Sequence, residues 1–113
     1  MQALDPHAAA RDAVASSTAR PATAILLDTA DVRLVVFRIE PGQSVAPHHN
    51  ASTVMLTVLH GEGYISGREG DRLCKVGDVV AYDPGETHGM RAADRPLHLL
   101  ATITPRPGER RAS

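Results

Sequence analysis

The chain has 113 residues and a mass of 12.0 kDa, enough for one domain and too little for two independent cores. Its 12 basic and 13 acidic residues give a formal net charge of −1, and its only aromatic residues are Phe37, Tyr64 and Tyr82. This composition argues against a nucleic-acid partner and against binding to a membrane surface. Cys74 is the single cysteine, so no intrachain disulfide is expected and the cytoplasm is the expected location.

Residues 1–23 are expected to form an N-terminal arm. Asp5 followed by Pro6 is typical of a helix N-cap with proline in the first helical position, which predicts a short helix over Pro6–Ala15. The apolar face of that helix is mostly alanine and would bury little surface, so the arm is expected to be loosely held. At the other end, residues 105–113 contain two prolines and three arginines and are predicted to be a flexible tail.

The segment between them, residues 24–104, is predicted to be a single all-β barrel. Eight of the nine glycines lie between Gly42 and Gly89, where they separate short runs of Val, Ile, Leu and Thr. Several short strands with turn signals between them are typical of an antiparallel sandwich or barrel. The predicted strands are Ala24–Leu27, Val32–Ile39, Ser44–His49, Val54–His60, Gly63–Ser66, Arg72–Lys75, Val79–Asp83, Thr87–Ala92 and Leu97–Thr104.

Three of these strands are apolar on both faces. In Val54–His60, the residues that alternate toward either side are almost all apolar, and the same holds for Val32–Ile39 and Leu97–Thr104. Such strands are expected to be central and covered on both sides. One cover is the barrel's own core, and the other is either a further layer or a partner subunit.

Histidine is the residue type with the most chemical potential in this chain, which has six of them. Neutral imidazole is a common ligand of transition metals and titrates near neutral pH. Because alternate residues of a strand share a face, His48 and Asn50 are predicted to project together, with His49 turned away. A folded barrel can bring His88 next to them, although sequence spacing alone is a weak metal signal.

Two segments resemble the motifs of the cupin superfamily. Pro41–Asn50 together with Val58–Gly63 is similar to the first cupin motif, and Gly77–His88 is similar to the second. The resemblance covers most of residues 32–105. It implies a double-stranded β-helix of the jelly-roll type with a short N-terminal arm, usually found as a homodimer.

The resemblance also implies a metal site, from which this chain departs. His48 matches the family's first histidine and His88 its last, but Asn50 stands where a second histidine is usual and Val54 where a glutamate is usual. Asn50, or His49 if the strand bulges, would have to complete the ligand set. The implied cofactor is a divalent transition metal: Fe, Mn, Ni, Cu or Zn.

Two functions remain open at this stage. In the first, His48 and His88 hold a metal or a small organic ligand, and an enzymatic activity would be that of a metal-dependent oxygenase or isomerase. The apolar wall of the ligand pocket would then consist of Val54, Leu56, Val58 and Met90. In the second, the metal site has degenerated and the barrel binds or senses a small molecule without catalysis. His60 is expected at the barrel rim and His98 on the outside in either case.

Overall fold

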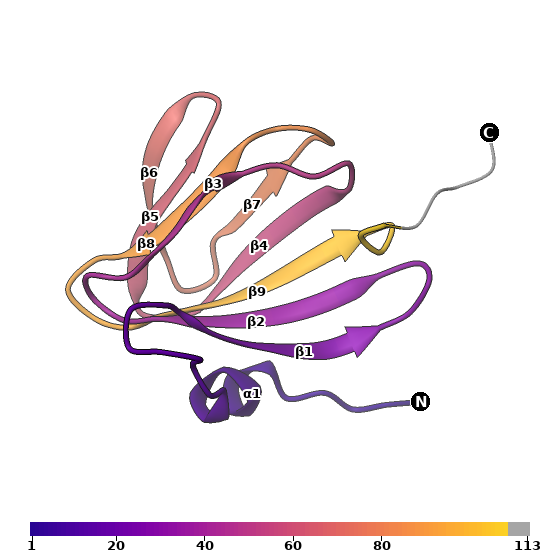
Figure 1. Cartoon of the computed structure of the whole chain (residues 1–113), viewed down its shortest axis with the longest axis horizontal. Coiled ribbons are helices and arrows are strands. Elements are labelled where there is room, and N and C mark those ends of the chain that lie inside the picture. Colours follow the sequence, from indigo (N-terminus) through magenta and orange to yellow (C-terminus); the bar gives the residue numbers. More distant parts are fainter. Residues whose placement is uncertain (109–113) are drawn as a thin grey trace.

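The structure is a computed structural model that describes residues 1–108, in which nine strands form two antiparallel sheets facing each other (Figure 1). The five-stranded sheet has the order β1-β2-β9-β4-β7 and the four-stranded sheet the order β3-β8-β5-β6. The strands are β1 (Ala22–Asp28), β2 (Arg33–Ile39), β3 (Ser44–His48), β4 (Thr53–His60), β5 (Glu62–Gly67), β6 (Gly70–Lys75), β7 (Val79–Tyr82), β8 (His88–Ala92) and β9 (Leu97–Thr104). Every predicted strand is present, and no end moves by more than two residues.

The core lies between the two sheets. Along β4, buried and partly buried residues alternate, so Val54, Leu56 and Val58 point inward. The inward residues of β9, which include Leu99 and Ala101, oppose them across the sheet. The outer side of β4 is only partly buried, so the chain itself covers that side incompletely.

The predicted N-terminal helix is present as α1 (Pro6–Asp12), which ends three residues earlier than expected. The Asp5 side chain accepts a hydrogen bond of 3.0 Å from the amide of Ala8, as the N-cap prediction requires. In residues 1–108, no helix has the length and apolar character needed to span a membrane.

Helix α1 packs on the outer face of the five-stranded sheet (Figure 1), where the sequence predicts a loosely held arm. Ala10 and Val36 of β2 have no exposed surface. The Arg38 guanidinium donates hydrogen bonds of 2.8 and 2.7 Å to the carbonyls of Ala10 and Arg11 at the end of the helix. Those carbonyls have no partner inside the helix, so Arg38 both caps α1 and attaches it to the sheet.

The first residues of the predicted tail are also attached to the barrel. The Ser52 hydroxyl donates a hydrogen bond of 2.7 Å to the carbonyl of Pro105. The Arg106 guanidinium donates to the Asp28 carboxylate at 2.7 and 3.3 Å. These contacts hold Pro105 and Arg106, whereas the sequence predicts a flexible tail from Pro105 onward; residues 109–113 of that tail lie outside the described residues.

Candidate ligand site at the barrel mouth

A β-bulge in β3 sets the position of His48. Val45 opposes Met90 and His48 opposes His88, so three steps along β3 match two steps along β8. Without the extra residue, alternation would place Pro47 opposite His88. From the sequence, a bulge in this strand is considered only as a means of directing His49 into the ligand set. The bulge comes earlier and places His48 opposite His88, while His49 is exposed.

Three rings meet at the end of the barrel where β3 ends and β8 begins, which is called the mouth here. The ring centroids of His48 and His88 are 4.2 Å apart with an interplanar angle of 65°, and the Tyr82 ring of β7 lies 4.8 Å from that of His88. His48 is exposed, whereas His88 is only 4% exposed. The Tyr82 hydroxyl donates a hydrogen bond of 2.8 Å to the carbonyl of Ser66. The three rings therefore extend from the exposed His48 to the buried His88 and Tyr82.

The hydrogen bonds of the two histidines fix their tautomers. Nδ1 of His48 lies 3.0 Å from the carbonyl oxygen of Ala46, and Nδ1 of His88 lies 3.2 Å from that of Glu86. A carbonyl oxygen only accepts, so each Nδ1 carries the proton in these contacts. In the neutral rings, the lone pair is then on Nε2. Each neutral ring of the pair therefore has one nitrogen that can accept a hydrogen bond.

Burial keeps His88 neutral. It is the main cause that lowers the pKa of His88, and the nearby His48 and His49 act in the same direction against the opposing effect of Glu86. Burial, followed by the charge of Glu86, raises the pKa of the Tyr82 hydroxyl, so this group keeps its proton. The interior of the site is therefore uncharged at neutral pH.

The two positions at which the chain departs from the cupin motif have structural roles. The Asn50 side-chain oxygen accepts a hydrogen bond of 2.9 Å from the amide of Ser52, and its main-chain oxygen accepts one of 2.7 Å from Gly85. Asn50 thus shapes the β3–β4 loop and ties it to the β7–β8 loop. Val54 is 3% exposed and lies opposite Tyr82 in the sheet.

The donor set of this site does not fit the metal centre that the family motif implies. Among residues 1–108, no group of three or more His, Cys, Asp or Glu side chains is arranged to hold a metal ion. Valine has no donor atom, and the Asn50 oxygen already accepts a hydrogen bond. Two imidazoles remain, fewer than the three protein ligands typical of a catalytic zinc site.

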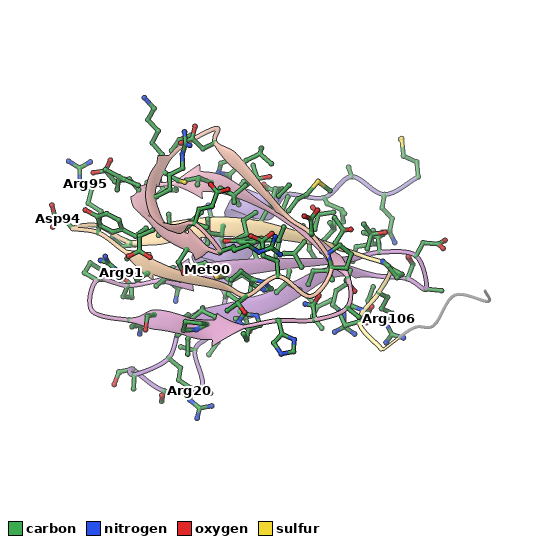
Figure 2. The ribbon with its side chains drawn as sticks, turned by 90° about the horizontal axis from the view of Figure 1, so that it is seen from above. Arg20, Met90, Arg91, Asp94, Arg95 and Arg106 are labelled. Carbon is green, nitrogen blue, oxygen red and sulfur yellow. The ribbon has the colours of Figure 1, made fainter. Side chains whose placement is uncertain are left out.

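The residues of the predicted apolar wall lie in the core between the two sheets. Each of Val54, Leu56, Val58 and Met90 is at most 4% exposed and belongs to the hydrophobic core. Met90 follows His88 by two residues on the inner face of β8 and lies in the middle of the molecule (Figure 2). These four side chains are packed within the core, and their contact with a ligand stays a prediction.

Tyr82 belongs to the site although its role at the mouth was not predicted. It lies within the second motif, and the alternation of Val80 and Tyr82 places both on the inner face of β7. Its distance from His88 depends on the packing of one sheet against the other, which the strand pattern does not contain. The one signal in the sequence for this role is that Tyr82 is one of only three Phe, Trp or Tyr residues in the chain.

Two facing antiparallel sheets with a histidine pair at their mouth define a double-stranded β-helix of the jelly-roll class. The cupin domain model matches residues 35–103, and the chain belongs to the cupin family. No curated protein sequence matches it.

Several solved structures share the fold. A conserved protein of Klebsiella pneumoniae with a double-stranded β-helix domain is 28% identical, with a TM-score of 0.76 over 85% of this chain and 86% of the other. A protein of Thermotoga maritima described as a predicted oxalate decarboxylase is also 28% identical, with a TM-score of 0.70 over 75% of this chain and 80% of the other. An RmlC-like cupin of Desulfovibrio desulfuricans is 25% identical, with a TM-score of 0.73 over 83% of this chain and 91% of the other.

Proposed function

We propose that this cupin binds a small organic molecule at the barrel mouth without catalysing a reaction on it. The observation that carries the proposal is the contact of the His48 and His88 rings, whose centroids are 4.2 Å apart while each Nδ1 faces a main-chain carbonyl, so that each neutral ring keeps its Nε2 as an acceptor. Two neutral acceptors match a ligand that donates hydrogen bonds, such as one with hydroxyl or amino groups.

A metal-dependent oxygenase or isomerase is the second candidate. In its favour are the two imidazoles of the site, the family membership and the description of the Thermotoga maritima protein as a predicted oxalate decarboxylase. Against it is the donor set, in which Asn50 and Val54 replace the remaining ligands. We therefore place ligand binding first.

Thermal shift measurements on protein without a histidine tag test the proposal. A panel of polyols, amines and carboxylic acids should contain compounds that raise the melting temperature of the wild type. His88→Phe keeps a ring against Tyr82 but removes the acceptor, so it should abolish these shifts. His49→Gln is the matched control and should retain them, because His49 is exposed and outside the pair.

Elemental analysis of the same preparations separates the two candidates. Near-stoichiometric iron, manganese, nickel, copper or zinc that is present in the wild type and lost in His88→Phe would favour the metal enzyme and overturn the proposal. Ligand-induced shifts that persist in His88→Phe would place the ligand elsewhere and would also overturn it.

We also propose that the chain forms a homodimer through the five-stranded sheet. Val79 on the edge strand β7 is an exposed apolar side chain that opposes Thr57 on the outer side of β4, and that side is only partly buried. Exposed apolar surface of this kind favours a protein partner. Light scattering coupled to size-exclusion chromatography should give twice the mass of 12.0 kDa, and a monomer mass would contradict the dimer.

A further inference from the structure

A second pair of histidines meets at the other end of the barrel. His60, the last residue of β4, opposes His98 of β9, and their ring centroids are 4.8 Å apart with an interplanar angle of 42°. His98 follows Arg95 by three residues, and Figure 2 shows Asp94 and Arg95 at the end of the molecule opposite to Arg106. Tyr82, whose ring contacts that of His88, opposes Val54, six residues before His60 on β4, so the pair is separate from His48 and His88.

A second β-bulge creates this pair. Val58 opposes Leu99 and His60 opposes His98, so Leu59 is the extra residue on β4. In a regular strand, His60 would share the inward face of Val54, Leu56 and Val58. The bulge turns its side chain to the outer face, where His98 lies.

Both rings are free to act as ligands. Neither makes a hydrogen bond to another group of residues 1–108. His60 is exposed, and no buried side-chain nitrogen of a less exposed residue there lacks a partner, so the ring nitrogens of His98 reach solvent. Burial is the main cause that lowers the pKa of His98, followed by the nearby His60 and Arg38. His60 also borders an open hollow of about 600 Å³ whose lining includes the carboxylates of Glu62 and Asp94.

The spacing of the rings fits a shared metal ion. Metal–nitrogen distances of about 2.1 Å, with a ring nitrogen about 1.1 Å from its centroid, place the ion about 3.2 Å from each centroid. For nitrogen–metal–nitrogen angles between about 90 and 110°, the two centroids are then about 4.5 to 5.2 Å apart. The observed 4.8 Å lies inside this range, whereas the 4.2 Å of His48 and His88 lies below it.

We propose that His60 and His98 form a bidentate surface site for a borderline transition-metal ion such as Zn²⁺, Ni²⁺ or Cu²⁺. Imidazole is a preferred ligand of these ions. No third His, Cys, Asp or Glu of residues 1–108 completes a protein cage around the pair, so water fills the other positions. The nearest further charges are Arg38, whose guanidinium pairs with Glu40 at 3.2 Å, and His7 of α1.

Calorimetric titration of untagged protein with Zn²⁺, Ni²⁺ and Cu²⁺ at pH 7.5 tests the site. One ion should bind per chain, and His60→Gln and His98→Gln should each weaken binding roughly tenfold or more because they remove one arm of the chelate. His7→Gln and the double variant His48→Gln with His88→Gln are matched controls that should retain this event. Unchanged binding in His60→Gln and His98→Gln, or its loss in the double variant, would overturn the proposal.

A measurement on the wild type avoids dependence on variants. Substoichiometric Cu²⁺ should broaden the nuclear magnetic resonance signals of His60, His98 and their strand neighbours before those of His48 and His88. Broadening that begins at His48 and His88, or at no site, would contradict the inference.

Discussion

Gly61→Ala is expected to lower the free energy of unfolding by about 3 kcal/mol or more. Gly61 has a φ of +74°, in the left-handed region that L-residues avoid, and a Cβ there would collide with the carbonyl oxygen of Pro96. The next contacts of that Cβ, at 3.2 and 3.5 Å, are also backbone atoms, of Pro96 and Leu97. Relief of the collision therefore requires that the β4–β5 turn and the β8–β9 turn move apart. The destabilising effects of backbone strain and of overpacking therefore add at this position.

Gly77→Ala is the matched control. Gly77 has a φ of +93°, but a Cβ there would meet nothing within 4 Å. This variant carries the backbone strain alone, about 1 to 2 kcal/mol. Denaturant unfolding of both variants and of the wild type gives the comparison. Equal losses at positions 61 and 77 would show that the two turns do not approach each other as closely as the structure has them.

The strands were predictable from sequence because alternation and turn residues are local signals. The alternate spacing of Val54, Leu56 and Val58 indicates which face of the strand is buried, and each glycine-containing turn marks the end of a strand. The docking of α1 was not predictable in this way. It depends on Arg38, which lies 27 and 28 residues beyond the carbonyls that it binds.

The bulges limited the prediction of both histidine pairs. A bulge is not visible in the amino-acid composition of a strand segment, yet it turns every later side chain of that strand to the other face. The shift near Ala46 and Pro47 decides that His48 faces His88, and the shift at Leu59 decides that His60 faces His98. Pro47 was a usable signal, because proline within a strand is confined to edges and bulges and β3 is an edge strand.

The double variant Asn50→His with Val54→Glu is expected to gain a metal-dependent melting temperature. It places an imidazole and a carboxylate at the two positions where the cupin motif usually has ligands. Val54 is buried opposite Tyr82, whose ring lies 4.8 Å from that of His88, so a carboxylate there would lie close to the histidine pair. With His48 and His88, the site would then have four protein ligands of the type that Zn²⁺, Mn²⁺ and Ni²⁺ accept.

Without metal, the same variant should be less stable than the wild type. A buried and unpaired carboxylate costs several kcal/mol, and the amide of Ser52 loses the oxygen of Asn50. With metal at about 100 times its dissociation constant, binding returns about 2.7 kcal/mol, and the melting temperature should rise by about 10 °C or more. The opposite signs of the two effects distinguish a reconstructed metal site from a general change in stability.

The experiment should be done in a His98→Gln background, so that the proposed site at His60 and His98 does not contribute. Thermal unfolding is recorded in chelator and in each metal, with Asn50→His and Val54→Glu alone as controls that should gain less. If the melting temperature of the double variant does not change when metal is added, the side chains at positions 50 and 54 do not converge on His48 and His88. A large gain would show that this barrel lacks only donor atoms, because the sheets and the bulge of β3 already hold the two imidazoles in place.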